Sequence, residues 1–119
     1  MAFADATAVT VTTLPTRTAT SIASGTLTAV DGTNGNKFVA NRDTILRVVN
    51  GSGGSLTVTV NTNYTVYGLT VPDATFTVAN SGDVLWTGFE TIFHQNEQKQ
   101  VHVEFSTGSS VTMAVYQPL

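Results

Sequence analysis

Cysteine and charge are both scarce in this sequence. The chain contains no cysteine, so disulfide bonds and thiolate metal sites are excluded. Only 11% of its residues are charged, whereas about 25% is typical of a globular domain. The five basic residues are spread singly along the chain and the net charge is −3. Electrostatic binding to nucleic acid or to an anionic membrane surface is therefore disfavoured.

Long apolar runs are also missing. No stretch approaches the roughly 20 apolar residues that a membrane span requires. The start of the chain lacks the basic region and the continuous apolar run of a signal peptide. We therefore expect a soluble protein made in a cytoplasm, with no membrane partner. The length of 119 residues is that of one domain.

Threonine and a two-residue periodicity dominate what is present. The chain has 22 threonines, most of them next to valine, alanine or another threonine. Apolar and polar residues alternate nearly everywhere, and no window shows the apolar spacing of an amphipathic helix. Turn sequences such as DGTNGN and NGSGG separate the alternating segments. The strands we expect are Ala8–Thr13, Thr26–Val30, Thr44–Val49, Ser55–Asn61, Tyr64–Val71, Thr75–Ala79, Val84–Thr87, Thr91–His94, Gln100–Phe105 and Ser110–Tyr116.

This pattern predicts an all-β fold. An alternating sheet has to bury its apolar face against a second layer, so many short strands indicate a single-domain antiparallel β-sandwich. We expect a jelly-roll-like version over residues 25–119. Trp86 and Phe89 are expected in its core, because both lie in an apolar run.

The N-terminal segment, residues 1–24, differs from the rest. It is rich in threonine and alanine and lacks the large apolar side chains that build a core. It is either a loose terminus or an extended arm that adds a strand to a neighbouring subunit. The alternation of Val9 and Val11 favours the arm, and Pro15 would end its strand pairing. We expect Val9 and Val11 at a subunit or capsid interface, serving assembly more than the fold.

The two histidines, His94 and His102, lie near Glu90, Glu97 and Glu104. Within a strand His102 and Glu104 share a face, which makes two metal ligands geometrically possible. A third ligand is missing at any recognisable spacing, so a metal site is disfavoured. We expect instead a solvated or subunit-facing strand surface, and we expect no cofactor and no metal.

The remaining motifs favour turns over chemistry. DGTNGN has the oxygens of a calcium loop, but Asp31 is its only charged ligand, and Asp-Gly and Asn-Gly are ordinary turn pairs. GSGGS lacks the Lys-Ser/Thr of a phosphate-binding loop and precedes a strand. No Gly-x-Ser-x-Gly elbow is present, and the acidic residues are scattered. We therefore expect a protein that is not an enzyme.

Three stretches carry a resemblance to a known family. They are NRDTILRVVNGSGGSLTVTVNT, VPDATFTVANSGDVLWTGFE and FHQNEQKQVHVEFSTGSSVTMAVYQ, which together span roughly residues 41 to 117. In this order they resemble small β-rich virion proteins of tailed bacteriophages, in particular head decoration or auxiliary capsid proteins. The shared features are a VVN strand end before a glycine turn, a TVTV strand, a Gly-Phe step, a VxVxFS strand and a valine-rich final strand.

The resemblance implies a structural protein that binds the major capsid protein on the outer surface of an icosahedral head. It also implies a homo-oligomer, with a trimer preferred, located on the capsid surface of the virion. Thr57 and Thr59 are then expected at a subunit or capsid interface, because threonine favours strands and hydrogen-bonds at modest desolvation cost. A plain solvated sheet face is the alternative.

A rival function comes from a different class. A carbohydrate-binding or host-receptor module of a phage tail or head fibre would use exposed aromatic rings for stacking. The residues available for that platform are Tyr64, Tyr67, Trp86 and Tyr116. Trp86 lies in DVLWTGF, a run more typical of a core than of an exposed platform.

Overall fold

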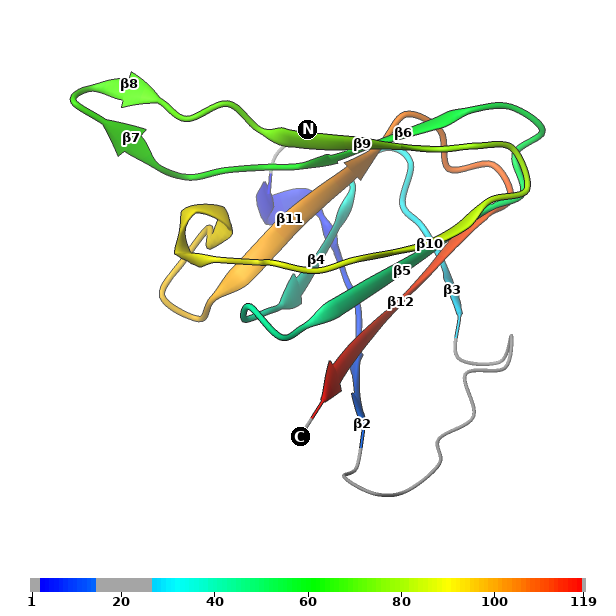
Figure 1. Ribbon diagram of the computed structural model, residues 1–119, viewed down its shortest axis with the longest axis horizontal. Helices are drawn as coiled ribbons and strands as arrows, with labels where there is room; N and C mark the ends of the chain where they lie inside the picture. The colour runs from blue at the N-terminus through cyan, green and yellow to red at the C-terminus, as the bar shows by residue number, and fades with distance from the viewer. Residues whose placement is uncertain (1–2, 15–26, 119) are drawn as a thin grey trace.

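Alternating segments form two five-stranded sheets and one short hairpin. The computed structural model describes residues 3–14 and 27–118 (Figure 1). Within these residues two short 3-10 helices, η1 (Phe3–Asp5) and η3 (Thr91–Phe93), accompany the strands. The strands are β1 (Thr7–Ala8), β2 (Val11–Leu14), β3 (Thr28–Ala29), β4 (Asn36–Val39), β5 (Ile45–Asn50), β6 (Leu56–Val60), β7 (Thr65–Val66), β8 (Leu69–Thr70), β9 (Ala74–Val78), β10 (Asp83–Trp86), β11 (Gln100–Phe105) and β12 (Val111–Pro118). The all-β expectation is confirmed.

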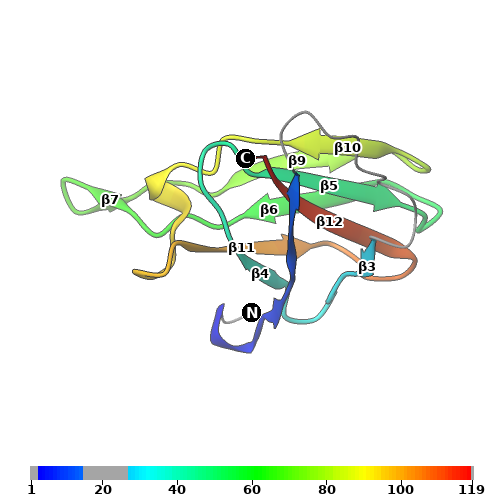
Figure 2. The same cartoon turned by 90° about the horizontal axis from the view of Figure 1, so that it is seen from below.

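The two sheets pack as a sandwich, although neither is wholly antiparallel. The first sheet has the order β1-β4-β11-β6-β9 and the second the order β10-β5-β12-β2, with β3 also beside β12. Strand β1 runs parallel to β4, and β2 runs parallel to β12. The other pairs are antiparallel. The hairpin β7–β8 projects beyond both sheets in each of two perpendicular views (Figures 1 and 2).

Valine, leucine and phenylalanine side chains fill the space between the sheets. Val58 and Val60 of β6 are fully buried in one cluster with Leu46 and Val48 of β5. Each such side chain contributes about 1.5–3 kcal/mol when it leaves water. Their polar neighbours in the alternation point outward, as the sequence pattern predicts.

The aromatic residues expected in the core lie there or against it. Phe89 is fully buried, which confirms that expectation. Trp86 is half-buried and packs against the core. Its ring lies almost parallel to that of Phe76, with centroids 5.8 Å apart, and meets Phe89 edge-on at 4.9 Å.

Four elements differ from the sequence-based expectation. The expected strand Ala8–Thr13 is divided into β1, which joins the first sheet, and β2, which joins the second. The expected strand Tyr64–Val71 is broken into β7 and β8 by a turn at Tyr67 and Gly68, whose φ angles are 51° and 81°. The expected strand Thr91–His94 is wrong, because Thr91–Phe93 form the 3-10 helix η3 and His94 follows it outside any strand. Strand β4 was not expected, because its first residue, Asn36, belongs to the turn-like DGTNGN and is a buried polar side chain.

The N-terminal segment is part of the sandwich over residues 3–14. Strands β1 and β2 pair with β4 and β12 of the same chain. Val9 and Val11 are half-buried and pack against the core, and the Val9 N–H donates to the Lys37 carbonyl at 2.9 Å. This corrects the expectation of an arm extending away from the domain. The rest of the expected arm, residues 15–24, lies outside the described residues.

Candidate functional site

The turn at one end of the sandwich is built from small residues, in the sequence NGSGG. The buried Asn50 side chain ties the NGSGG turn together: its Nδ2 donates to the carbonyls of Gly54 at 2.7 Å and Val78 at 3.0 Å. Its Oδ1 accepts from the N–H and hydroxyl of Ser52. Gly53 takes a positive φ of 90°, which glycine adopts without strain. The polar groups here are used within the turn, so the stretch has a structural role.

The opposite end, called the hairpin end below, combines several longer segments. Hairpin β7–β8, helix η3 and the turns at residues 40–44 and 94–99 all lie there (Figure 1). The N–H of Asn63 donates to the carbonyl of Ile92 at 2.9 Å, and the Gln95 side chain donates to the carbonyl of Asn61 at 3.1 Å. These bonds join the base of the hairpin to η3 and the segment after it.

A continuous two-stranded ribbon runs from the first sheet to the tip of this end. Residues 56–78, called the β6–β9 ribbon here, contain the β6–β9 pair and then β7–β8 as its outer continuation. Asp73 is the only charged residue of the ribbon. Its carboxylate accepts from the N–H of Thr62 at 2.8 Å. The ribbon therefore offers a long surface almost free of charge.

Threonines cover the outer face of this ribbon within the sheet. Thr57 lies opposite Thr77, and Thr59 lies opposite Thr75. Thr57 is exposed and Thr59 is half-exposed. The two threonines proposed as interface residues thus face outward, while Val9 lies at the other side of the same sheet, beyond β11 and β4. The structure does not bring the four expected interface residues together.

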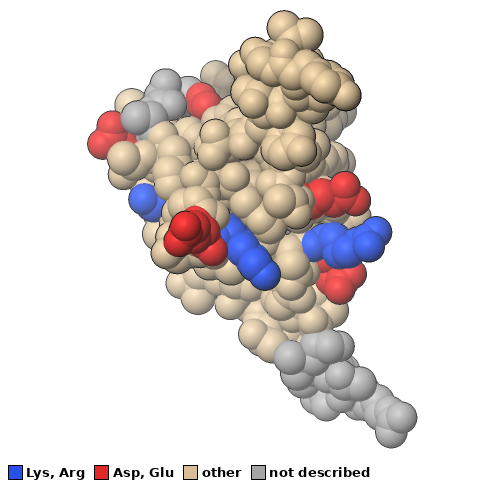
Figure 3. Space-filling model, turned by 90° about the vertical axis from the view of Figure 1, so that its left-hand side faces the viewer, with Lys and Arg blue, Asp and Glu red and all other residues tan. Residues whose placement is uncertain are grey.

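Large apolar side chains are exposed at the hairpin. Tyr67 is fully exposed, Leu69 is 74% exposed, and Tyr64 and Val66 are about half exposed. Figure 3 faces this end, and the part that protrudes at the top of the view carries no Lys, Arg, Asp or Glu. Exposed apolar side chains are ordinary when single, but a contiguous group indicates a contact surface. Sequence reasoning missed Val66 and Leu69, although the uncharged run YTVYGLTV was a usable signal.

The backbone conformation at the hairpin tip is unfavourable for the tyrosine found there. Tyr67 has a φ of 51°, a region in which a bulky residue is a rare outlier. Two-residue turns with both φ angles positive favour Asn-Gly or Asp-Gly. Gly68 satisfies this preference, whereas Tyr67 does not. The tyrosine therefore occupies a position where asparagine would be relaxed.

The outer edge of the ribbon is also open. Strand β9 is the last strand of its sheet, and within the described residues its outer edge pairs with no further strand. An open edge presents unpaired backbone groups, and natural proteins commonly protect such an edge with charged residues. Strand β9, with the sequence ATFTV, has none.

The histidines are used in structural hydrogen bonds. His102 is buried, and its Nε2–H donates to the carbonyl of Asn34 at 2.9 Å. Its Nδ1 accepts from Asn61 Nδ2 at 2.9 Å, and the same amide donates to Glu104 at 2.6 Å. His94 Nε2–H donates to the Ala40 carbonyl at 2.9 Å. In the described ranges, no three or more His, Cys, Asp or Glu side chains are grouped so that they could hold a metal.

The DGTNGN stretch is a turn. Asp31 Oδ1 accepts from the backbone N–H groups of Thr33 and Asn34, both at 2.9 Å. The pKa of the Asp31 carboxyl is lowered by three hydrogen bonds. The largest effect comes from the Asn34 N–H, followed by the Thr7 hydroxyl and the Thr33 N–H. Gly35 has a φ of 78°, and a Cβ there would lie 2.6 Å from the carbonyl oxygen of Val103. The interpretation as turn chemistry is confirmed.

The aromatic platform of the rival function is reduced to two residues. Tyr116 is buried, and Trp86 packs against the core. Tyr64 and Tyr67 are exposed, and both belong to the β6–β9 ribbon. A stacking surface is therefore available only at the hairpin among the residues first considered for it.

The comparisons with known proteins identify no relative. The chain matches no protein-family model, no curated protein and no solved structure. In the part of the chain that the structure describes, no helix is sufficiently long and apolar to span a membrane.

Proposed function

We propose that the protein is a non-enzymatic structural protein of the virion of a tailed bacteriophage. In this role it binds the outer capsid surface as a decoration or cement protein that stabilises the head. The observation that carries the proposal is the β6–β9 ribbon, which combines an uncharged open edge with an exposed apolar tip.

The physical reason is that both features are unfavourable in water and favourable in a contact. Burying an apolar side chain such as Leu69 against another protein contributes up to about 1.5–3 kcal/mol. An open strand edge can gain main-chain hydrogen bonds when a second chain adds a strand to it. A ribbon with one charged residue places few ionic groups in such a contact.

We also infer that the sandwich is a jelly roll. The strand order supports this, because β3-β12-β5-β10 stacks on β4-β11-β6-β9, and every pair within these two sets is antiparallel. Successive strands alternate between the sets except at β6 and β9. Jelly rolls of this kind occur in viral capsid and lectin domains. Strands β1 and β2 are then additions at the sheet edges.

The partners that fit the ribbon are the major capsid protein and further copies of this chain. A homo-oligomer closes by symmetry, and three copies suit a local three-fold axis of an icosahedral head. In a closed trimer the open edge and tip of each copy are covered by the next copy or by the capsid. The location proposed for the protein is the capsid surface of the virion.

The test is co-sedimentation with undecorated heads of the parent phage. We expect the wild-type protein to sediment with the heads to a saturating ratio. A variant with Tyr67→Asn and Leu69→Ser should lose at least about tenfold in affinity, the loss expected for about 1.4 kcal/mol. Leu85→Ser is the matched control, because Leu85 is also exposed and apolar but lies on β10. Failure of the wild type to sediment, or equal sedimentation of the hairpin variant, would refute the proposal.

A carbohydrate-binding or host-receptor module of a phage tail or head fibre is the second candidate. It is favoured by the exposed rings of Tyr64 and Tyr67 at the projecting hairpin. A glycan array distinguishes the two candidates. Glycan hits that disappear in Tyr67→Asn, together with no binding to heads, would replace the capsid assignment by this one.

A further inference from the structure

The backbone groups of β6 show which groups of β9 face the open edge. Thr57 of β6 uses its backbone on the β11 side: its N–H donates to Ser106 Oγ at 2.9 Å, and its carbonyl accepts from the Ser106 N–H at 3.0 Å. Along an antiparallel strand the backbone groups of successive residues point to alternate sides. The β6 residues that face β9 are therefore Leu56, Val58 and Val60, and the β9 residues that face β6 are their partners in the ladder.

Thr75 and Thr77 consequently direct their N–H and carbonyl groups away from β6. They lie opposite Thr59 and Thr57, at positions where the two strands exchange no hydrogen bond. Strand β9 is the last of its sheet and runs along the rim of the molecule (Figure 1). Within the described residues these two N–H groups and two carbonyls have no hydrogen-bond partner. The edge therefore offers two donors and two acceptors in a row.

The sequence of β9, ATFTV, is symmetric about Phe76 in the residues that matter at the edge. When two copies of the strand are antiparallel with Phe76 opposite Phe76, Thr75 of each copy lies opposite Thr77 of the other. Residues of this kind exchange both of their N–H···O bonds in an antiparallel pair. Two such pairs with two bonds each use every outward group of both edges.

Neighbouring registers satisfy fewer of these groups. A shift that places Thr75 opposite Thr75 brings Thr77 opposite Asp73, which lies before the strand begins. A shift that places Thr77 opposite Thr77 brings Thr75 opposite Ala79, whose carbonyl already accepts from the Gly82 N–H at 2.8 Å. The register centred on Phe76 is therefore the favoured one.

Charge and side chains suit the same register. Strand β9 has no charged residue, and Asp73 lies opposite Ala79 of the other copy, so no like charges meet. On the outer face, the row formed by Thr57 and Thr77 of one copy continues with Thr75 and Thr59 of the other. Cross-strand threonine pairs stabilise such a row. The pairing thus extends the outer threonine face across two molecules.

We propose that β9 pairs with β9 of a second copy across a two-fold axis, which joins the two first sheets into one continuous sheet. The partner is a second copy, because the match of backbone groups, register and charge is between β9 and itself. This inference rests on the proposed function, since β9 belongs to the ribbon assigned there to assembly, and it names the partner of the edge. Antiparallel pairing directs the two hairpins to opposite ends, so Tyr67 and Leu69 stay available for the contact proposed above.

The contact is weak by itself, since a stable interface has about ten hydrogen bonds. Paired edges are therefore few in dilute solution and accumulate where copies are held close together, as on the surface of a head. A covalent trap is the suitable measurement for such a contact, because it collects pairs that form only briefly.

The test is disulfide trapping, for which the absence of native cysteine leaves a clear background. Thr75→Cys and Thr77→Cys each place one thiol at an exposed position. In the proposed register position 75 lies opposite position 77 of the other copy with Cα atoms about 5.5 Å apart, which a disulfide can bridge. Identical positions are diagonal neighbours about 7–8 Å apart, beyond that range. Mild oxidation of an equimolar mixture should therefore give at least about tenfold more cross-linked dimer than either variant alone.

Two further variants separate edge pairing from collision and from unfolding. Thr59→Cys mixed with Thr77→Cys is the matched control, because Thr59 lies on the same face but one strand inside the edge. It should give no more dimer than a single variant. Thr75→Pro added to the Thr77→Cys chain removes an outward N–H that the β6 ladder does not use. This double variant should melt within a few degrees of its parent and lose most of the trapping with Thr75→Cys.

Several results would overturn the proposal. Equal trapping by the mixture and by the single variants would show random collision, and equal trapping by the Thr59→Cys control would show a different contact. Trapping that survives Thr75→Pro would show that the edge is not paired through its backbone. If the wild type sediments with heads while the mixture shows no enrichment, the edge pairing fails and the capsid proposal stands. Enrichment without sedimentation would leave the edge pairing in place and refute the capsid proposal.

Discussion

The turns at the two ends of the sandwich differ in the size of their side chains. At the small-residue end, Ser81 and Ser110 take positive φ values of 63° and 56°, and the neighbouring turn is built from glycine and serine. At the hairpin end, Tyr67 and Lys99 take similar values of 51° and 60°. A positive φ costs most residues other than glycine, asparagine and aspartate roughly 1–2 kcal/mol. Among the residues that the structure describes, large side chains therefore occupy strained positions at the hairpin end only.

This difference indicates that the large side chains at the hairpin end do not serve the local backbone conformation. At the small-residue end, side chains such as Asn50 complete hydrogen bonds within the turn. At the hairpin end, Tyr67 and Lys99 have backbone angles that are unfavourable for their side chains, and both side chains are exposed. Places where a residue opposes its local backbone preference are expected at functional sites.

The largest expected effect is the difference in stability loss between two leucine substitutions. Leu56 of β6 is fully buried, whereas Leu69 of β8 is 74% exposed. Leu56→Ala should lower the free energy of unfolding by about 2–5 kcal/mol, because it leaves a cavity in the core. Leu69→Ala should change it by less than about 0.5 kcal/mol. Chemical denaturation of both variants measures this, and similar losses would mean that the hairpin is part of the core.

Deleting residues 2–20 should also destabilise the fold. The deletion removes β1 and β2 and uncovers the core beneath Val9 and Val11. We expect a loss on the order of 3 kcal/mol from this packing and the lost strand pairing. Denaturation of the truncated chain tests it. Unchanged stability would restore the view of this segment as an arm that serves assembly alone.

A smaller effect concerns the paired charges of the second sheet. Arg47 binds Asp83 through two hydrogen bonds of 3.0 and 2.7 Å, which lowers the pKa of the Asp83 carboxyl. Because the pKa of Asp83 is lower in the folded state, the pair contributes fully to the free energy of unfolding above the ordinary Asp pKa of about 3.9. This contribution is lost as the pH falls through the pKa of Asp83 in the folded state. Because the Asp83 side chain is 46% exposed, the contribution should be under about 1 kcal/mol.

Asp83→Asn is the variant that tests this pair. Unfolding should be followed between pH 7 and about pH 2, since the ordinary Asp pKa lies inside that window. The wild type should be slightly more stable than the variant at neutral pH, and the difference should vanish at the acidic limit. A difference that persists at the acidic limit would mean that the variant acts through packing and not through charge.

The body of the fold could be predicted from sequence because its strands alternate strictly. Val58, Val60 and their threonine neighbours alternate with a period of two, and the structure places them inside and outside as expected. Strand β4 was missed because it begins with the buried Asn36. That side chain is satisfied by the Asp31 N–H at 2.9 Å, a contact between a turn and a strand that no local pattern predicts.

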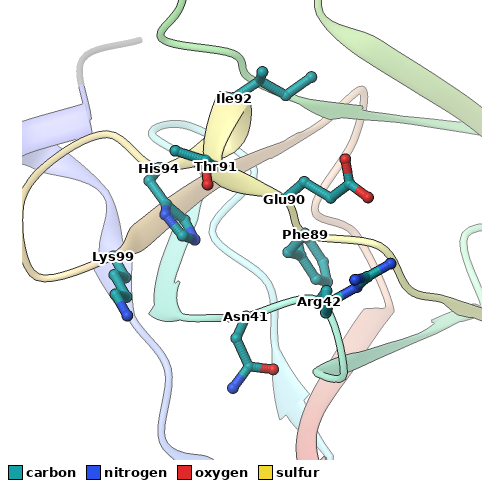
Figure 4. Close-up of a pocket in the computed structure, with 8 residues that line it drawn as sticks. All are labelled: Asn41, Arg42, Phe89, Glu90, Thr91, Ile92, His94 and Lys99. Carbon is teal, nitrogen blue, oxygen red and sulfur yellow. The ribbon is translucent and has the colours of Figure 1, made fainter.

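The hairpin end was less predictable for a physical reason. A tyrosine before Gly68 does not signal a turn in the way asparagine would, so residues 64–71 were expected to form one strand. A cavity beside η3 is lined by Arg42, Glu90 and Lys99 (Figure 4), which come from three segments that only the folded chain brings together. Thr57 and Thr59 were correctly expected on an outer face, but which partner covers them depends on contacts with another molecule.

The most direct test of the assembly role is a pair of measurements on Tyr67→Asn. Asparagine suits the positive φ of this turn, so the variant should melt at the same temperature as the wild type or slightly higher. Light scattering should give a trimer mass for the wild type and a monomer mass for the variant at the same concentration. A variant that melts several degrees lower and still forms the wild-type oligomer would contradict the account, because Tyr67 would then serve the fold and not the contact.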